Sequence, residues 1–263
     1  MKPTVIVLCG GLGTRLREET EFRPKPMVEI GGRPILWHIM RTYAAAGLDE
    51  FVLALGYKGH MIKEYFLNYQ AMTSDFTLRT GRAGSMGFHA PPKDDWSVTC
   101  AETGYDAQTG ARVRKALKYC TSDEICITYG DGLADIDINQ LLAFHRSHGR
   151  IGTVTSVAVA SRFGEMSMEP DGQVTSFAEK PPDAAPTISG GYFVFDRERL
   201  EGYLREGDDL VFEREPIERL VADRQLVAYR HHGFWQCMDT YREWKVLEDL
   251  WATGRAPWAI STP

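Results

Sequence analysis

The residues best suited to chemistry stand in a glycine-rich segment near the start of the sequence. Gly10, Gly11 and Gly13 follow a short apolar run, and Thr14 and Arg15 come directly after them. Glycines allow backbone N–H groups to approach a phosphate closely, and the threonine hydroxyl adds a further donor. The guanidinium of an arginine offers a fork of N–H groups that matches phosphate oxygens. The segment therefore predicts a phosphate-binding loop.

The spacing of these glycines excludes two common nucleotide-binding loops. A dinucleotide loop has the pattern Gly-x-Gly-x-x-Gly, but counted from Gly11 and Gly13 its third glycine would fall on Leu16. The P-loop pattern Gly-x-x-x-x-Gly-Lys-Ser/Thr does not occur in the chain. The simplest alternative is a glycine turn beside exposed cations. Arg15 and Lys25 flank the glycines in a longer pattern, which favours the phosphate-binding interpretation.

Two aspartates from separate parts of the chain are candidate metal ligands. Asp131 follows a strand-like run that begins near Glu124, and Asp239 lies between an apolar stretch and a helix-like segment. Two carboxylates can hold one Mg²⁺, which prefers oxygen ligands and keeps positions for phosphate and water. An aspartate before a helix is also a common N-cap, so the residue pattern alone leaves Asp239 open between cap and ligand.

A competing acidic pair lies close by in the sequence. Asp135 and Asp137 form an Asp-x-Asp pattern, by which many glycosyltransferases hold a metal and a nucleotide-sugar. The pair comes several residues after the strand end and directly before a helix-like segment. Carboxylates in that position cap the helix and interact favourably with its dipole. We therefore expect one or both carboxylates to cap the helix, with a metal-dependent glycosyltransferase as the alternative.

Alternating strand-like and helix-like segments predict the fold that positions these residues. The expected strands lie at 4–8, 51–55, 97–101, 124–129 and 152–159, and the expected helices at 34–46, 59–69, 111–119 and 138–148. This order implies an α/β fold with a mainly parallel, Rossmann-like open sheet flanked by helices. The glycine-rich segment then follows the first strand, at the sheet edge where such folds bind ligands.

The rhythm of the sequence changes in the C-terminal third. Residues 164–179 have the pattern of a β-hairpin, with Pro170-Asp171-Gly172 as its turn. A strand at 188–195 and helices near 212–223 and 240–251 follow, whereas residues 81–95 show no regular pattern. No repeat or linker interrupts the chain. We therefore expect a single domain over residues 1–263, with the last third as an insertion packed on the same sheet.

Composition and charge exclude several classes of function. The chain has 263 residues, of which 43% are hydrophobic, and a formal net charge of −6. That size supports a substantial core, and the acidic balance argues against a nucleic-acid groove, which needs clustered Lys and Arg. No apolar run approaches the ~20 residues of a membrane span, and the N-terminal residues lack a signal-peptide pattern.

The cysteines indicate a reducing environment. Five cysteines are scattered along the chain with no Cys-x-x-Cys pair, so we expect a cytoplasmic protein without a zinc site. His231 and His232 lack a third partner at metal spacing and are expected to be structural. Four tryptophans are expected in the core or in contacts of a homo-oligomer: Trp235, Trp244, Trp251 and Trp258.

The glycine-rich segment resembles the signature of a known enzyme family. The string Gly10-Gly11-Leu12-Gly13-Thr14-Arg15-Leu16, continued by Pro24-Lys25-Pro26-Met27, is similar to the signature of the sugar-phosphate nucleotidylyltransferases. Further strings resemble the cytidylyl branch of that family, and the resemblance covers nearly the whole chain. They are Pro26 to Gly32, Pro34 to Met40, Tyr129-Gly130-Asp131-Gly132 and Gly233 to Thr240.

The resemblance implies transfer of a cytidylyl group from CTP to glucose 1-phosphate, with Mg²⁺ as cofactor. CDP-glucose for the deoxysugars of a surface polysaccharide such as O-antigen would be the product. Asp131 and Asp239 match the family's metal ligands, and Arg15 and Lys25 are the expected catalytic cations. About residues 1–150 would form the nucleotide-binding half. Its expected contacts are Leu8, Cys9, Gly10, Gly11, Leu12, Gly13, Thr14, Arg15, Lys25, Ala107, Arg112 and Gly130.

The remaining half, about residues 151–263, would bind the sugar phosphate and carry the C-terminal helices. Its expected contacts are Gly164, Glu179, Lys180 and Gly191. Ser189 stands where close relatives have Asn, and Cys9 where they usually have Ala.

Two alternatives stay open beside the cytidylyl reaction and the glycosyltransferase. The first is the same chemistry with UTP or dTTP. The second is a non-catalytic module that binds sugar nucleotides. Such a module should have lost Arg15, Lys25 or an aspartate, and all of these residues are present.

Overall fold

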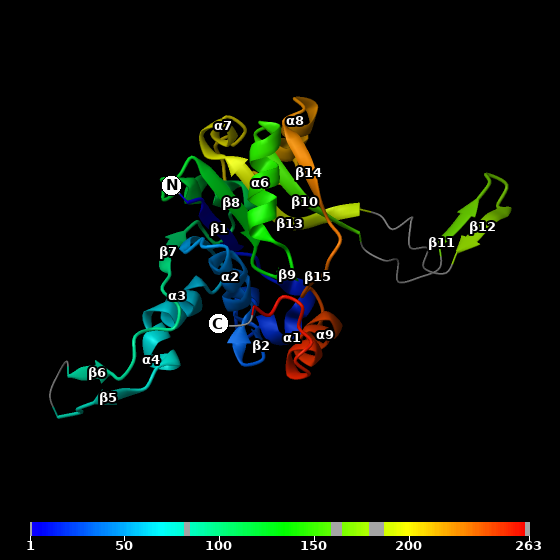
Figure 1. Ribbon diagram of the computed structural model, residues 1–263. Coiled ribbons are helices and arrows are strands. Elements are labelled where there is room, and N and C mark those ends of the chain that lie inside the picture. The colour runs from blue at the N-terminus through cyan, green and yellow to red at the C-terminus, as the bar shows by residue number, and fades with distance from the viewer. Residues whose placement is uncertain (1, 82–84, 159–164, 179–186, 261–263) are drawn as a thin grey trace.

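A mainly parallel sheet forms the centre of the molecule. The computed structural model describes residues 2–81, 85–158, 165–178 and 187–260 (Figure 1). Within them, a 7-stranded sheet has the order β14-β10-β13-β8-β1-β4-β7. Its strands are β1 (Thr4–Cys9), β4 (Glu50–Leu55), β7 (Ser97–Glu102), β8 (Glu124–Tyr129), β10 (Gly152–Ala158), β13 (Thr187–Asp196) and β14 (Leu226–His231). Neighbours are parallel except where β13 pairs with β10 and β8, which confirms the predicted fold class.

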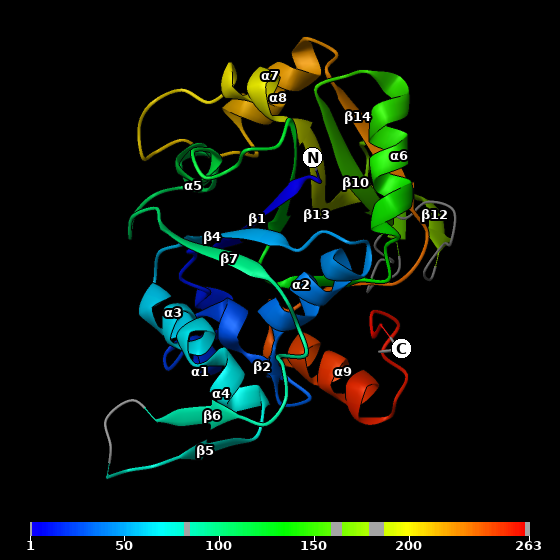
Figure 2. The same cartoon turned by 60° about the vertical axis from the view of Figure 1, so that its left-hand side comes forward.

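Both faces of the sheet are covered by helices. Val5 and Val7 of the fully buried β1 join one apolar cluster, while Ile6 and Leu8 join the other, because strand side chains alternate between faces. The first cluster includes side chains of α2 (Ile35–Ala45), α3 (Gly59–Leu67), α6 (Ile138–His148) and α9 (Tyr241–Ala252). The second includes side chains of α5 (Thr109–Leu117), α7 (Arg197–Glu201) and α8 (Glu215–Ala222) (Figure 2).

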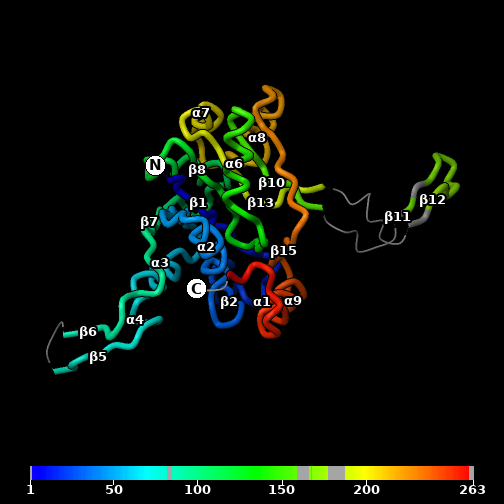
Figure 3. Tube along the Cα trace, in the orientation of Figure 1, coloured from blue at the N-terminus to red at the C-terminus, as the bar shows by residue number. Residues whose placement is uncertain are grey.

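The C-terminal segment returns to the beginning of the chain (Figure 3). The Gly31 N–H donates to Glu248 of α9 at 2.8 Å. Upstream of α9, strand β15 (Trp235–Cys237) pairs with β9 (Gly132–Ala134), and the Met238 N–H donates to the Asp131 carbonyl at 2.8 Å. This pairing brings Asp239 beside Asp131, although the two residues are far apart in sequence.

Two hairpins extend from the body of the molecule (Figure 1). The predicted one is formed by β11 (Glu165–Met168) and β12 (Val174–Ala178), and the Gly172 N–H donates to the Glu169 carbonyl across its turn. The other was not predicted: β5 (Phe76–Leu78) pairs with β6 (Met86–Phe88). Its strands are short and largely exposed, so they lack the apolar alternation that marks a strand in sequence.

Most predicted elements are confirmed to within a few residues. Among the elements that were missed are the short helix α7 and the strands β9, β14 and β15. Strand β14 lies at the edge of the sheet. Its residues are partly buried or exposed and none is fully buried, so the apolar alternation that marks a strand in sequence is weak. No helix in the described ranges is long and apolar enough to cross a membrane. The remaining elements are η1 (Thr14–Leu16), α1 (Arg17–Thr20), η2 (Lys25–Met27), β2 (Glu29–Ile30), β3 (Arg33–Pro34) and α4 (Tyr69–Thr73).

Candidate active site

The glycine-rich loop leaves β1 and is held in shape by Thr20. Gly13 has a φ of 64°, in the left-handed region that favours glycine. A Cβ there would also lie 2.7 Å from the Thr20 methyl group. The Thr20 hydroxyl donates to the carbonyls of Gly13 and Leu16, at 2.9 Å each. Gly11, in contrast, would place a Cβ in open space, so its backbone is accessible to a ligand.

Arg112 anchors the other end of the loop. Its buried guanidinium donates to the carbonyls of Gly10 at 3.0 Å, Leu55 at 2.9 Å and Gly104 at 2.8 Å. A Cβ on Gly10 would lie 2.1 Å from this guanidinium, so the missing side chain makes room for Arg112, and a backbone contact of Gly10 with a phosphate stays a prediction. Arg112 also lines the pocket described below, and direct contact with a nucleotide stays a prediction.

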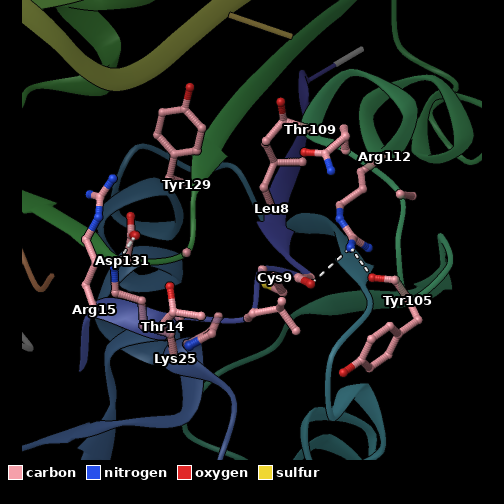
Figure 4. Close-up of a pocket in the computed structure, with 18 of the residues that line it drawn as sticks. Leu8, Cys9, Thr14, Arg15, Lys25, Tyr105, Thr109, Arg112, Tyr129 and Asp131 are labelled. Atoms are coloured by element: carbon pink, nitrogen blue, oxygen red, sulfur yellow. Dashed lines mark hydrogen bonds and ion pairs between the residues drawn. The ribbon is translucent and has the colours of Figure 1, made fainter. Parts of the chain in front are cut away.

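Two cationic and two carboxylate side chains are in contact beside the glycine-rich loop. The Lys25 ammonium donates to Asp131 Oδ2 at 2.7 Å (Figure 4). It also donates to Asp239 Oδ1, and Arg15 Nη1 donates to Asp239 Oδ2 at 2.8 Å. The Lys25 side chain is only 9% exposed. Burial lowers its pKa, but the two carboxylates outweigh burial and the net pKa is raised. Lys25 therefore stays charged.

The Asp239 carboxylate is also held in its charged form. Burial raises its pKa, but hydrogen bonds and charge from Lys25 and then Arg15 outweigh this and lower the net pKa. Asp239 is not the cap of α9. Thr240 caps that helix, and Glu243 accepts from the backbone N–H groups of Asp239 and Thr240 at 2.9 Å each. The structure thus leaves the Asp239 side chain free to face the cations.

A pocket of about 480 Å³ opens beside these charges (Figure 4). It is lined by all the residues predicted to bind the nucleotide and by both predicted metal ligands. Cys9, at its floor, is fully buried, and burial raises the pKa of its thiol, so it behaves as a small neutral side chain. Six further lining residues were not predicted: Pro26, Tyr105, Asp106, Gln108, Thr109 and Tyr129. Tyr129 could have been found, because it directly precedes Gly130-Asp131 at a strand end.

Of the predicted sugar-phosphate contacts, only Gly191 lies among the described residues. Gly164, Glu179 and Lys180 lie outside them. Gly191 is not a lining residue of the pocket. It has a φ of 79°, and a Cβ there would lie 2.5 Å from the ring of Tyr129, so glycine is needed to accommodate that ring. Its contact with a sugar stays a prediction.

The two aspartates of the competing Asp-x-Asp pair have partners outside the candidate active site. Asp137 caps α6 by accepting from the Gln140 N–H at 3.1 Å, as predicted. Asp135 does not cap this helix, whose N-cap is Asp137, and its Oδ1 lies 3.0 Å from His231 Nε2. Neither aspartate lines the pocket beside the glycine-rich loop. The pair therefore stands apart from the phosphate-binding elements.

The donor set suits a divalent cation. Asp131 and Asp239 come from separate segments, yet both contact the same ammonium nitrogen, so one cation is within reach of both. Carboxylate oxygens are the ligands that Mg²⁺ prefers, and the open pocket leaves room for phosphate and water ligands. No group of three or more His, Cys, Asp or Glu side chains that could hold a metal ion on its own is found in the described ranges.

An open α/β sheet with a glycine-rich, cation-flanked loop after its first strand defines a class of enzyme that handles phosphorylated substrates. The chain belongs to the nucleotidyl transferase family, whose model matches residues 4–240.

The relatives agree with this assignment. A glucose-1-phosphate cytidylyltransferase of Salmonella typhi is 44% identical over 96% of this chain and 97% of its own length. A mannose-1-phosphate guanylyltransferase of Mycobacterium tuberculosis is 29% identical over 89% of this chain and 60% of its own. A solved UDP-glucose pyrophosphorylase, complexed with UDP-glucose, superimposes with a TM-score of 0.69 over 97% of this chain and all of its own, at 14% identity. That last likeness concerns the fold.

Proposed function

We propose that this enzyme transfers the cytidylyl group of CTP to glucose 1-phosphate, giving CDP-glucose and pyrophosphate. The observation that carries the proposal is the meeting of Arg15, Lys25, Asp131 and Asp239 at the glycine-rich loop. The 44% identity to a glucose-1-phosphate cytidylyltransferase over nearly the full length supports the choice of substrates.

The chemistry is an in-line displacement at phosphorus. A phosphate oxygen of glucose 1-phosphate forms a bond to the α-phosphorus of CTP, and the bond from that phosphorus to the bridging oxygen of pyrophosphate breaks. The attacking oxygen is already an anion, so no general base is required. Catalysis then depends on positioning and on neutralising charge.

Each cation has a separate role in this scheme. Arg15, exposed at the pocket mouth, neutralises the charge of the leaving pyrophosphate. Lys25, nearly buried below it, binds the α-phosphate. The pair of carboxylates would hold Mg²⁺, which supplies positive charge to the phosphates when bound. Lys180 would bind the phosphate of the sugar.

The proposal includes a cytoplasmic location, which the free thiols of all five cysteines support. Assembly as a homo-oligomer stays a prediction. Each of the two alternative functions differs from the proposed one in a single feature. Uridylyl or thymidylyl transfer needs only different contacts to the base, whereas a non-catalytic module has no use for the four charged residues.

A pyrophosphate-release assay tests the substrate pair. CTP, UTP, dTTP and ATP would each be combined with glucose 1-phosphate and Mg²⁺. We expect CTP to give the highest kcat/KM. Equal or faster turnover with UTP or dTTP would contradict the cytidylyl assignment and leave the reaction class intact. No pyrophosphate from any nucleotide would favour the non-catalytic module.

A further inference from the structure

A carboxylate outside the pocket connects two of the residues that line it. Tyr129, at the end of β8, donates its hydroxyl hydrogen to Glu213 Oε1. Thr109, the first residue of α5, donates to Glu213 Oε2 at 2.6 Å. Both hydroxyl-bearing residues line the pocket, and Glu213 does not. Figure 4 shows the two hydroxyls pointing to the same side of the pocket.

The segment that carries Glu213 is firmly held. Phe212 is fully buried and packs edge-on against Phe193 and Phe195. The Phe212 N–H donates to the Thr109 hydroxyl at 2.9 Å, so this hydroxyl accepts one hydrogen bond and donates another. The backbone at Glu213 is thus held in place, and both oxygens of its carboxylate accept a hydrogen bond.

The upstream part of the same segment docks on the start of α5. The Ala111 N–H donates to the Leu210 carbonyl at 3.1 Å, and the Gln108 N–H donates to the Asp208 carbonyl at 2.8 Å. A Cβ on Gly110 would lie 2.9 Å from the Leu210 carbonyl oxygen, so the two backbones are in close contact. The start of α5 and the Glu213 segment therefore form one packed unit.

The ring of Tyr129 is fixed on its other sides as well. It packs edge-on against Phe193. It also lies so close to Gly191 that there is no space for a side chain on that residue. Tyr129 is two residues from Asp131, and Thr109 belongs to a second lining segment, which runs from Tyr105 to Thr109. A link between the two hydroxyls consequently sets the position of the carboxylate side of the pocket relative to the α5 side.

We propose that Glu213 is a positioning residue for the transfer reaction, acting through the hydroxyls of Tyr129 and Thr109. It aligns the nucleotide, held on the α5 side, with the phosphate-binding charges around Asp131. This inference rests on the proposed function for the identity of the substrates. It predicts an effect on kcat, because misalignment by a fraction of an ångström slows the chemical step without removing a contact to substrate.

The test compares variants that break the link at different points. Tyr129→Phe and Thr109→Val each remove one hydroxyl, and Glu213→Ala removes the shared acceptor. We expect each to lower kcat about 10-fold, with the KM for each substrate changed less than about 3-fold. If Glu213 acts through Tyr129, the double variant Tyr129→Phe with Glu213→Ala should be no slower than Glu213→Ala alone.

Controls separate positioning from stability. Thr109→Ser keeps the hydroxyl and should retain wild-type kcat. Glu215→Gln changes a carboxylate that accepts from Arg205 at 2.7 Å in the same segment, and should leave kcat unchanged. Glu213→Gln keeps one acceptor oxygen and serves if Glu213→Ala does not fold. Every variant is assayed with the nucleotide and sugar phosphate that the wild type turns over best, so a wrong substrate assignment is recognised separately.

Three results would overturn the inference. One is a multiplicative loss of about 100-fold in the double variant, which would show independent roles. Another is a raised KM at unchanged kcat. The third is a lower unfolding midpoint in Glu213→Ala and Glu213→Gln with wild-type kcat, which would make the link structural only.

Discussion

Replacing Asp239 by Asn should strengthen the binding of CTP in the absence of metal. In the structure, Asp239 engages both cations that are proposed to bind the triphosphate, Lys25 through Oδ1 and Arg15 through Oδ2. A metal-free triphosphate must compete with this carboxylate for Lys25 and Arg15, and it is repelled by the carboxylate as well. The Asn variant lacks the charge, so both cations become more available to phosphate.

The burial of each cation decides which of the two ion pairs determines the size of the change in CTP affinity. The Arg15 side chain is 76% exposed, and such an ion pair contributes at most about 1 kcal/mol. The Lys25 side chain is 9% exposed, where a hydrogen bond to a charged group contributes roughly 1.5–3 kcal/mol, or ~10- to 150-fold in affinity. An Asn side chain can still accept one hydrogen bond from Lys25. We therefore expect the lower end of this range, about 10-fold tighter binding of CTP by Asp239→Asn.

Titration calorimetry with CTP, first with a chelator and then with Mg²⁺, measures this effect. With Mg²⁺ the expected sign reverses, because the variant lacks one of the two proposed metal ligands, and binding should be weaker than in the wild type. Asp137→Asn is the matched control, since Asn also caps a helix well and Asp137 contacts neither cation. Weaker binding of CTP to Asp239→Asn in chelator would refute the competition between carboxylate and phosphate.

Three further outcomes are expected. Asp131→Asn should lower kcat at least ~100-fold in steady-state assays through loss of an electrostatic anchor, and an equal loss in Asp137→Asn would move the metal to the Asp-x-Asp pair. Lys180→Ala should raise the KM for glucose 1-phosphate about 10- to 150-fold, the value of one charge-assisted hydrogen bond, and a raised KM for CTP would contradict the division into two halves. Burial lowers the pKa of His38 to about 4 from 6.5. The unfolded chain therefore gains a proton first as the pH falls, and the free energy of unfolding should decrease between pH 6.5 and 4 by up to roughly 3 kcal/mol. His38→Gln should flatten this dependence in urea unfolding, and an unchanged slope would show that another group titrates.

The elements that carry the site could be predicted because their signals are local. Strand β1 is apolar along its whole length, and the glycines and Arg15 follow it without interruption. Its place in the sheet centre follows from that continuous burial. Strand β8 and Asp131 follow the same logic. The pocket lining was predicted on these grounds together with the family resemblance, and the structure brings those residues together.

The contacts between these segments could not be predicted, because they depend on pairings distant in sequence. Lys25 and Asp239 are 214 positions apart, and they meet only because β15 pairs with β9. The packing of Arg112 against Gly10 could not be predicted for the same reason. The missing side chain of Gly10 makes room for Arg112, and nothing in the loop sequence indicates that an arginine 102 positions away occupies the space. Glu213 carried no signal either, since its partners are hydroxyls from two other elements.

The charge balance of the site explains why nucleotide and metal should bind together. Lys25 and Arg15 carry two positive charges and Asp131 and Asp239 two negative ones, so the four groups sum to zero. A triphosphate alone would meet two carboxylates, and a divalent cation alone would meet two fixed cations. Each ligand on its own must disrupt ion pairs that are partly buried. Together they supply a partner to every charge: the carboxylates gain a metal, and Lys25 and Arg15 gain phosphate oxygens. The ion pairs in the structure thus favour joint binding over either ligand alone.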